Sequence, residues 1–489
     1  MFLNRRRLED ILGARVPPEV AGVTGVAHDS RAVGPGYAFV AVPGFRRDGV
    51  EFAGEALRRG ASLVVAEREV PGGGPAVVVP DARVALAALA CAVYGDPSGD
   101  MEVYGVTGTN GKTTTSYVLY GVLAGAYGAA ECGLTTTAET ISGGERRPAG
   151  RTTPEAVEVQ GLLAEMLGKG VRRVVMEVSS HGIALERVTG TRFAGAIFTN
   201  LTRDHLDLHG TMEEYYRAKR ELFYRAEGPK LANAEDEWGR RLAGEAEGVT
   251  TFGRTEDADY RVAGVRATRR GTAFSLRHPG GTLELETPLL GGYNVLYVAG
   301  SAGLALAIGV VGAAVERAVR EMGQVPGRFQ RVAADGGFEV IVDYAHTDVG
   351  LAAVLEVARG VAESRGGAGR VICVFGAAGD RDGAKRPLMG RVASELADRS
   401  IITTDDAYSE DPAKIAREVA AGAEPGRTDV LLDRRKAIRK ALLGARAGDV
   451  VVVAGKGHER VQHLPEGDVP FHDASVVREI LEELGEKEG

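Results

Sequence analysis

The stretch Tyr104-Gly-Val-Thr-Gly-Thr-Asn-Gly-Lys-Thr-Thr-Thr115 is a glycine-rich loop that ends in a lysine and three threonines. An apolar run precedes it and an amphipathic segment follows it, so the pattern predicts a strand, a loop and the start of a helix. Glycines let backbone N–H groups approach phosphate oxygens, and the N-terminus of the next helix attracts an anion. We therefore expect a nucleoside triphosphate here, with Lys112 at the β- and γ-phosphates and Thr113 offering its hydroxyl to Mg²⁺.

The loop differs from the ordinary Walker A loop, which has a glycine five residues before its last glycine. This chain has Val106 at that position, and its glycines are Gly105, Gly108 and Gly111. A surface turn without function is the alternative, since the chain contains 68 glycines. The strand, loop and helix context favours the nucleotide.

Composition limits the classes of protein to which the chain can belong. Its 489 residues are enough for about three domains. The net charge of −8 and a pI near 5.8 argue against broad nucleic-acid binding. The three cysteines (Cys91, Cys132 and Cys373) are not at metal-ligand spacing, which predicts a reducing compartment and no structural zinc. No apolar region follows the N-terminal arginines, so we expect no signal peptide and a cytoplasmic protein.

Residues 295–315 carry no charge and are long enough to span a bilayer. The segment also contains four glycines and lies within sequence that reads as globular on both sides. We expect a buried helix, a glycine turn and a second helix that begins near Ala313. Membrane insertion is therefore not expected.

The chain divides into three blocks, residues 1–97, 98–326 and 327–489, and all three indicate an α/β fold. In the first, short apolar runs at 38–42, 62–66 and 76–79 alternate with helical stretches, which predicts a small α/β domain. The second contains the phosphate loop and predicted strands at 173–178 and 194–199. The third alternates helices with strands at 339–342, 370–375, 400–404 and 449–454, which predicts a Rossmann-like, doubly wound sheet. Ligands bind beyond the carboxyl ends of such strands.

Two polar clusters follow the predicted strands of the second block. Glu177 and His181 lie in one, and His205 and His209 lie in the other. A carboxylate and an imidazole beside a triphosphate suit a divalent cation, so we expect Glu177 and His205 to be metal ligands. His209 is interpreted as a residue that caps its loop.

Several motifs together resemble the Mur ligase family, ATP-dependent enzymes that join amino acids to a carboxylate. Gly108-Thr-Asn-Gly-Lys-Thr-Thr114 resembles the phosphate loop of that family. The helical pattern from Glu213 to Phe223 resembles the helix whose lysine, here Lys219, is carbamylated. The polar loops Asp343-Tyr-Ala-His346, Asp380-Arg-Asp382 and Gly455-Lys-Gly-His-Glu459 occur in the order typical of the C-terminal domain. The resemblance covers nearly the whole chain.

The first block carries the resemblance to a subgroup. Asp29-Ser-Arg31, Pro35 to Gly44 and Asp48-Gly49 resemble the UDP-binding domain of the ligases that add the third residue of the peptidoglycan stem. This implies a substrate of UDP-N-acetylmuramoyl-L-alanyl-D-glutamate, a free amino acid, ATP and Mg²⁺, and a monomer. Related ligases that build another polymer or act on folate are disfavoured by these motifs. A catalytically silent scaffold or a simple phosphotransferase is disfavoured by Lys112, Glu177, His205 and Lys219 together.

The resemblance implies site residues of four kinds. It implies that the phosphates are bound by Gly108, Thr109, Asn110, Gly111, Lys112, Thr113 and Thr114. It implies that adenine and ribose are bound by Asn294, Arg328 and Asp343. The implied ligands of Mg²⁺ are Thr113, Glu177, His205 and carbamylated Lys219. The implied ligands of the UDP-substrate are Ser30, Phe45, Arg46, Arg47, Thr152, Thr153, Ser179 and Arg187. The implied ligands of the amino acid are Arg381, Asp405, Asp406, Ala407, Tyr408, Gly455 and Glu459. Arg151 and Leu185 depart from the Asn and Gln of some relatives.

The loop from Asp405 to Tyr408 predicts which amino acid is added. Ligases that add meso-diaminopimelate have Asp-Asn-Pro-Arg there, and the arginine pairs with the distal carboxylate. Tyr408 replaces that arginine, and Asp406 adds negative charge that suits an ammonium. We therefore expect L-lysine or L-ornithine rather than meso-diaminopimelate, with a packing role for Tyr408 as the alternative.

Overall fold

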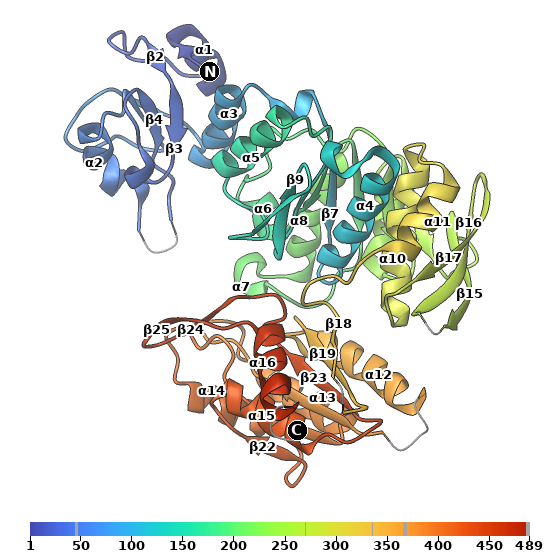
Figure 1. Ribbon diagram of the computed structural model, residues 1–489. Helices are drawn as coiled ribbons and strands as arrows, with labels where there is room; N and C mark the ends of the chain where they lie inside the picture. The colour runs from blue at the N-terminus through green and yellow to red at the C-terminus, as the bar shows by residue number, and fades with distance from the viewer. Residues whose placement is uncertain (45–46, 269, 335, 365–368, 486–489) are drawn as a thin grey trace. The chain divides into compact units, whose positions relative to one another are not determined.

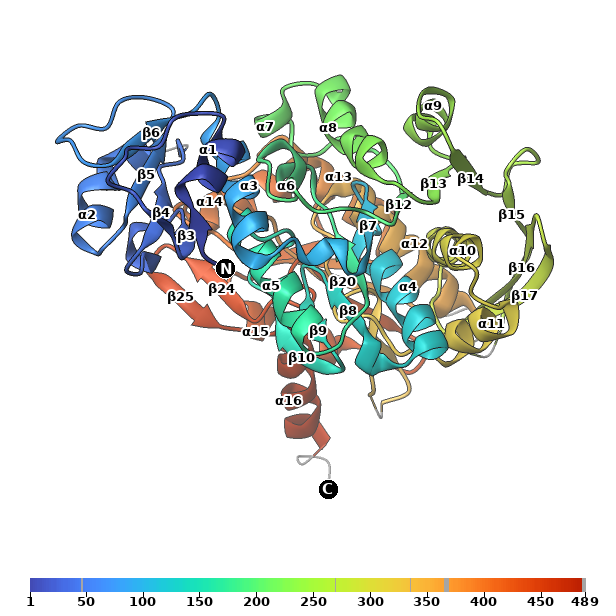
Figure 2. The same cartoon turned by 90° about the horizontal axis from the view of Figure 1, so that it is seen from above.

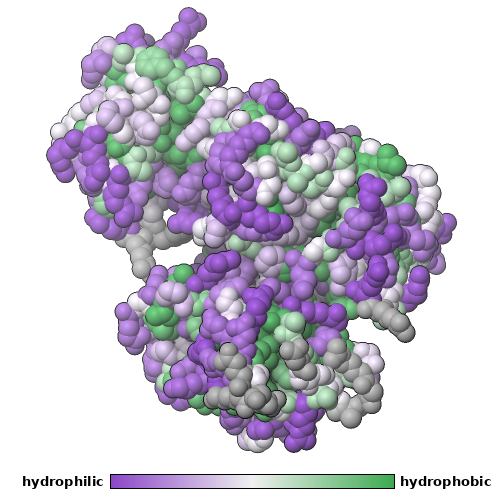
Figure 3. All heavy atoms as spheres, in the orientation of Figure 1, coloured by the Kyte–Doolittle hydropathy of each residue, from purple (hydrophilic) through white to green (hydrophobic). Residues whose placement is uncertain are grey.

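The computed structural model describes residues 1–489 except 45–46, 269, 335, 365–368 and 486–489. The chain forms two compact units (Figure 1). The first comprises 1–263, 276–283 and 296–319, and the second comprises 264–275, 284–295 and 320–489. On the face drawn in Figure 3, hydrophilic residues cover much of each unit and hydrophobic residues form small scattered groups, as is usual for a protein surface.

The N-terminal part of the first unit is a parallel sheet with helices on both faces. Its order is β3 (Gly25–Ala27), β4 (Tyr37–Val40), β5 (Leu63–Ala66) and β6 (Ala76–Val78). Alternate residues of β4 face opposite sides: Ala38 and Val40 pack in the cluster of α3 (Ala82–Tyr94), and Phe39 packs in that of α2 (Ala53–Arg58). The apolar runs expected at 38–42, 62–66 and 76–79 are therefore strands; β5 is buried on both faces, and the edge strand β6 exposes Val78.

Around this sheet lie short elements. The chain begins with β1 (Leu3–Asn4), α1 (Arg5–Leu12) and β2 (Gly22–Val23), and β1 pairs with β2. The chain before α2 forms a 3-10 turn, Gly49–Phe52. A further 3-10 turn, Pro97–Gly99, leads into the large sheet.

The large sheet has eleven strands and is parallel in its centre. Its order is β10 (Glu145–Pro148), β9 (Glu139–Ser142), β8 (Cys132–Thr135), β11 (Arg173–Glu177), β7 (Glu102–Thr107), β12 (Gly195–Phe198), β13 (Lys230–Asn233), β14 (Val249–Gly253), β15 (Tyr260–Ala267), β16 (Thr272–His278) and β17 (Gly281–Thr287). Strands β8 to β14 in this order are parallel, whereas β9 and β10 form an antiparallel hairpin at one edge. The predicted strands at 173–178 and 194–199 lie beside β7, which leads into the phosphate loop.

Helices cover both faces of this sheet, with α8 and α4 on opposite sides of β7 in Figure 2. One hydrophobic cluster joins the sheet to α5 (Ala156–Gly168), α8 (Met212–Arg225) and α9 (Glu237–Glu245). On the other side, α4 (Lys112–Tyr127) packs against β8 and β11. Gly300 and Gly303 let α10 (Gly292–Ala307) approach Phe252 and Leu231 closely. Two short helices, α6 (Ser180–Ala184) and α7 (Leu206–His209), follow β11 and β12.

The uncharged segment 295–315 folds as expected from its glycines. Helix α10 ends at Ala307, and α11 (Gly312–Glu321) begins one residue before the expected Ala313. Among the residues that the structure describes, no helix combines the length and apolar character needed to cross a membrane.

The second unit contains the doubly wound sheet that the alternation of strands and helices predicts. Its order is β18 (Gln330–Val332), β19 (Glu339–Asp343), β23 (Val450–Ala454), β20 (Val371–Phe375), β21 (Arg399–Ile402) and β22 (Thr428–Val430). All pairs are parallel except β18 with β19. One face packs against α12 (Asp348–Ser364), α13 (Lys385–Leu396) and α14 (Pro412–Ala420), and the other against α15 (Arg434–Gly444) and α16 (Asp473–Gly485). A hairpin of β24 (Val461–Leu464) and β25 (Gly467–Pro470) follows β23.

Candidate active site

The phosphate loop connects the end of β7 at Thr107 to the start of α4 at Lys112. Two of its glycines are required by their surroundings. A Cβ on Gly108 would lie 1.9 Å from Thr199 Oγ1, and a Cβ on Gly111 would lie 2.1 Å from Tyr297 Cζ. Both also have positive φ, 149° and 81°, which disfavours a side chain. Close packing and left-handed backbone therefore both select glycine here.

The segment after β12 holds the loop in place through hydrogen bonds. Asn110 N donates to Asn200 Oδ1 at 2.9 Å, and Thr199 Oγ1 donates to Asn110 O at 2.6 Å. Thr109 Oγ1 donates to Thr202 O at 3.2 Å. Lys112 Nζ donates to Thr109 O at 2.9 Å, so its ammonium lies over the loop.

Glu177, at the end of β11, lies against the loop as expected. Its Oε2 accepts hydrogen bonds from Thr113 Oγ1 at 2.9 Å and from Thr137 N at 3.1 Å, and Lys112 Nζ is 4.0 Å from its Oε1. Thr137 also donates its hydroxyl to Oε1 at 3.2 Å. Thr137 was not singled out in the sequence, because nothing marks a threonine between two short strands as part of a site.

Three histidines gather around Tyr215 on α8. The ring centroid of His181 is 4.8 Å from that of His205 and 6.0 Å from that of His209. His209 stacks on Tyr215 at 5.0 Å, and Tyr215 Oη is 3.2 Å from Thr109 Oγ1. Partial desolvation of the ring, then His181 and Lys112, lower the pKa of His205 against the opposing effect of Asp204, which favours the neutral imidazole that binds metals.

Lys219 points from α8 to the phosphate loop. Its side chain is buried, its Nζ donates to Gly108 O at 2.7 Å, and the ammonium lies 4.7 Å from the centre of the Tyr215 ring. Burial, followed by the nearby Lys112, holds the pKa of Lys219 well below its usual range. Lys219 is therefore not a solvated helix lysine, and its amine favours the neutral, nucleophilic form.

The residues expected to hold the UDP-substrate fall in two places. In the central part, Thr153 Oγ1 donates to Glu177 O at 3.1 Å and accepts from Ser179 N at 3.0 Å, and Arg187 Nη1 donates to Thr153 O at 3.1 Å. Thr152 Oγ1 lies 2.8 Å from Thr137 Oγ1. These residues therefore form one network with the Glu177 cluster.

The other members of that set lie in the N-terminal part. Ser30 Oγ donates to Glu55 Oε2 at 2.9 Å, and Arg47 pairs with Glu51 at 2.8 Å. Phe45 and Arg46 lie outside the described residues. Of the two departures, Arg151 pairs with Glu155 at 2.8 Å, and Leu185 ends α6. Glu155 also pairs with Arg187 at 2.7 Å.

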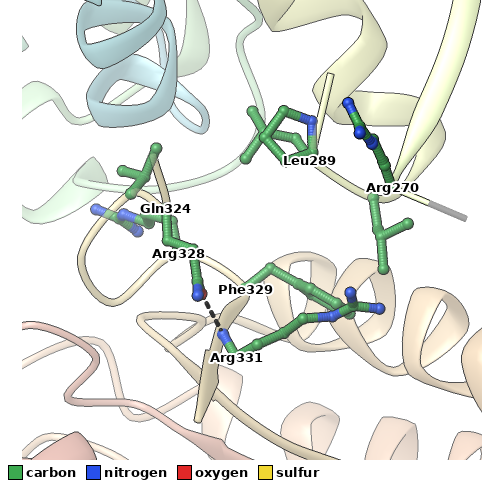
Figure 4. Close-up of a pocket in the computed structure, with 9 residues that line it drawn as sticks. Arg270, Leu289, Gln324, Arg328, Phe329 and Arg331 are labelled. Carbon is green, nitrogen blue, oxygen red and sulfur yellow. Dashed lines mark hydrogen bonds between the residues drawn. The ribbon is translucent and has the colours of Figure 1, made fainter. Parts of the chain in front are cut away.

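In the second unit, a cavity of about 130 Å³ is lined by Arg328, one of the three residues expected around adenine and ribose (Figure 4). The other two, Asn294 and Asp343, do not line it but bond residues of its wall. Asn294 Nδ2 donates to Leu290 O at 2.6 Å, and Asp343 Oδ2 accepts from Phe329 N at 2.5 Å. Arg328 lies 4.4 Å over the Tyr344 ring. The cavity is lined by Arg270, Pro288, Leu289, Leu290, Gln324, Val325, Arg328, Phe329 and Arg331. Apolar side chains and three arginines line it together, which suits a flat base attached to an anion.

The residues expected to hold the amino acid come together at the carboxyl ends of β20, β21 and β23. Gly379 N donates to Asp406 O at 2.7 Å, and the Arg381 guanidinium lies 5.4 Å from the Tyr408 ring centre. A Cβ on Gly455 would lie 2.3 Å from Asp405 Oδ2. Ala407 is buried in the same loop. Two unexpected members join them: His463 stacks on Tyr408 at 5.2 Å, and the buried Lys456 bonds both Asp406 and Glu459.

Sequence comparison identifies the family in three segments of the chain. Residues 22–94 match the family model described as "Mur ligase family, catalytic domain", and 106–305 match "Mur ligase middle domain". Residues 327–457 match "Mur ligase, glutamate ligase domain". Together these matches cover most of the chain.

Individual relatives align with this chain along nearly their whole length. Proteins from Solibacter usitatus and Gloeobacter violaceus, each named UDP-N-acetylmuramoyl-L-alanyl-D-glutamate--2,6-diaminopimelate ligase, are 42% identical to the chain, and each alignment covers 96% of both proteins. A solved structure of a ligase with that name has a TM-score of 0.68 at 30% identity and covers 99% of this chain and 100% of its own. The MurF ligase from Thermotoga maritima, solved with ADP, has a TM-score of 0.64 at 21% identity over 95% of this chain and 98% of its own, which supports the fold. The chain belongs to the Mur ligase family of ATP-dependent ligases and has its three-domain α/β fold.

Proposed function

We propose that this ligase adds the third residue to UDP-N-acetylmuramoyl-L-alanyl-D-glutamate in peptidoglycan synthesis. The observation that carries the proposal is the meeting of Lys112, Glu177 and Lys219 at one phosphate loop, where Lys112 is 4.0 Å from Glu177 and Lys219 bonds the loop backbone. The names of relatives that are 42% identical over 96% of their length support the same substrate. We place the reaction in the cytoplasm, with a monomeric enzyme.

The proposed reaction has two steps. First, an oxygen of the D-Glu side-chain carboxylate attacks the γ-phosphorus of ATP. The bond from that phosphorus to the β,γ-bridging oxygen breaks, ADP departs, and the product is an acyl phosphate. The α-amine of the amino acid then attacks the acyl carbon, phosphate leaves, and the nitrogen loses a proton as the amide forms. The protein contributes mainly by orientation and by neutralising charge. Lys112 and the backbone N–H groups of the loop would bind the phosphates.

The donor set at the loop fits Mg²⁺. The Thr113 hydroxyl and the Glu177 carboxylate are hard oxygen donors 2.9 Å apart, and His205 supplies a neutral imidazole. Bound there, Mg²⁺ would neutralise charge on the phosphate oxygens. Thr113, Glu177 and His205 would hold it, with Lys219 as a carbamate.

The burial of Lys219 supports that modification. A neutral amine adds CO₂ to give a carbamate and releases one proton. Lys219 is buried beside Lys112, which favours the neutral amine before the reaction and an anion after it. The carbamate would place an anion beside Lys112 where the unmodified amine carries no negative charge.

The remaining assignments follow the two substrates. We propose that the cavity in Figure 4 takes the adenine. Arg328 lines it, and Asn294 and Asp343 bond the lining residues Leu290 and Phe329. Ser30, Phe45, Arg46, Arg47, Thr152, Thr153, Ser179 and Arg187 would hold the UDP-dipeptide. The domain boundaries proposed are 1–97 for UDP-sugar binding, 98–326 for ATP and 327–489 for the amino acid.

For the added residue we propose a diamino acid, with L-lysine or L-ornithine favoured over meso-diaminopimelate. Tyr408 offers no positive charge, and oxygens of Asp405, Asp406 and Glu459 lie within 4.8 Å of one another. Such a cluster suits an ammonium better than a carboxylate. The second candidate is meso-diaminopimelate, which the names of the relatives favour, and Arg381 beside Tyr408 is a cation that can pair with its distal carboxylate.

The test is phosphate release by the purified protein with ATP, Mg²⁺, the UDP-dipeptide and each amino acid in turn. Release should depend on both the dipeptide and a diamino acid, and Lys112→Ala should lower it by about 100-fold or more. Release that needs neither acceptor would identify a simple ATPase. Ligation that is unchanged in Lys112→Ala would contradict the assignment of the phosphate loop.

A further inference from the structure

Lys456 is a fully buried lysine that links two of the three loops that carry the proposed amino-acid ligands. It follows β23, and its side chain has no exposed surface. Its Nζ donates to Asp406 Oδ1 at 2.7 Å and to Glu459 Oε2 at 2.9 Å. The two carboxylates come from different loops, so the lysine joins the loop after β21 to the loop after β23.

The surroundings of Lys456 are acidic. Oxygens of Asp405, Asp406 and Glu459 lie within 4.8 Å of one another, a spacing at which three carboxylates repel strongly when water is excluded. Arg434, a buried cation whose charge also acts on Asp405 and Asp406, donates its hydrogen bonds of 2.8 and 2.7 Å to Asp473 instead. Lys456 therefore cancels one of the three negative charges of the cluster.

Further hydrogen bonds fix both partners of Lys456. Asp406 Oδ1 also accepts from His463 N at 2.9 Å, and Glu459 Oε1 accepts from Tyr344 Oη at 3.3 Å. The ammonium is thus held by a rigid frame, and it occupies the position at which a substrate ammonium would otherwise meet Asp406.

We propose that Lys456 is a positioning residue that sets amino-acid selectivity by supplying an internal ammonium to this cluster. The inference rests on the proposed function and deepens it. A substrate ammonium must pair with the negative charge that Lys456 leaves on the cluster. An amino acid with a distal carboxylate is tolerated only because Lys456 reduces the repulsion between that carboxylate and the cluster. Without Lys456 the pocket becomes more acidic and selects cationic side chains more strongly.

The experiment compares kcat/KM for L-lysine, L-ornithine and meso-diaminopimelate in the full-length wild type, Lys456→Met and Lys456→Arg. Lys456→Met should raise the ratio of L-lysine to meso-diaminopimelate by about tenfold or more, with the KM for ATP unchanged. Lys456→Arg should keep the ratio within about threefold of the wild type because the charge is retained. Lys440→Met, an exposed lysine on α15, is the matched control and should leave every ratio unchanged.

The charge of Asp406 and its coupling to Lys456 can each be tested separately. Asp406→Asn, which removes negative charge, should move the ratio in the opposite direction. A double-mutant cycle on urea unfolding, Lys456→Met with Asp406→Leu, reports their coupling without catalysis. Ratios that stay unchanged in folded, active Lys456 and Asp406 variants, or no coupling in the cycle, would overturn the role of Lys456. A wild type inactive with every amino acid, although the coupling is present, would instead overturn the proposed function and the selectivity role with it.

Discussion

Lys219 Nζ donates a 2.7 Å hydrogen bond to the backbone carbonyl of Gly108, so a side chain from α8 is fixed on the phosphate loop. The contact joins residues 111 positions apart in the sequence. A hydrogen bond to the backbone holds the buried lysine in this position, so any modification of its amine acts directly on the loop.

We expect Lys219→Ala to lose about 100-fold or more of the ligase activity, because the site would lose the carbamate anion. A small carboxylic acid in the buffer should restore part of that activity by taking the place of the carbamate. Lys230, a lysine at the start of β13 that bonds a backbone carbonyl, is the matched control as Lys230→Ala. Full activity in Lys219→Ala, measured as phosphate release, would exclude the modification as a requirement.

A second prediction concerns Gly111, where the loop turns into α4. Gly111→Ala should abolish ATP binding measured by calorimetry, because its Cβ would meet the Tyr297 ring and its φ of 81° disfavours a side chain. The strained backbone alone costs about 1–3 kcal/mol. A Cβ on Gly121, within α4, would meet no neighbouring element within 4 Å, so Gly121→Ala should keep ATP binding and raise stability by about 0.5–1 kcal/mol. Normal ATP affinity in Gly111→Ala would show that the loop tolerates a side chain.

Amino-acid binding should depend on pH through Glu459. Burial, and then Asp405 and Asp406 against the opposing effect of Lys456, raise the pKa of Glu459 to about 7. Tyr344 contacts the same carboxylate. Because only the ionised form attracts a substrate ammonium, the KM for a diamino acid should rise as the pH falls below about 7 and level off above it. Glu459→Gln should flatten this profile, measured from pH 5.5 to about 8.5, and a profile that persists in the variant would assign it to another group.

The buried pair of Arg434 and Asp473 predicts a large effect on stability. Both side chains have no exposed surface, and Arg434 Nη2 also donates to Ala454 O at 2.9 Å. Asp473→Ala should lower the free energy of unfolding by about 3–5 kcal/mol, because it leaves a buried charge unpaired. Arg434→Met with Asp473→Leu should lose less than the single variant in urea unfolding. A double variant that is less stable than Asp473→Ala would mean that the arginine is needed for packing or for its bond to Ala454.

Much of the fold followed from local patterns in the sequence. Strands buried on both faces, such as β20 and β23, are continuous apolar runs, and a glycine-rich loop between a strand and a helix identifies β7 and α4. The antiparallel edge strands Glu139–Ser142 and Glu145–Pro148 were not predicted, because their polar residues and short length give little periodicity. The break between α10 and α11 was predicted because glycines mark it.

The candidate site was predictable where a motif carries its own chemistry, and less so where partners are distant in sequence. Glu177 beside Thr113 followed from two strands ending at the same sheet edge. The bond of Lys456 to Asp406 joins residues 50 positions apart, and the motif that contains Lys456 shows only its nearer partner, Glu459. Asp406 was expected to receive a substrate ammonium only because this internal lysine could not be placed from the sequence.

The hairpin of β24 and β25 touches the amino-acid loop through its backbone as well as its side chains. Gln462 Nε2 donates to Thr404 O and to Asp405 O at 3.1 Å each, and Tyr408 N donates to His463 O at 3.1 Å. A change of length or sequence in this hairpin therefore shifts the recognition loop as a unit while every group proposed to contact the amino acid is retained. Sequence changes in the hairpin can therefore alter which amino acid is selected for the cell wall, although no proposed ligand of the amino acid lies in this strand pair.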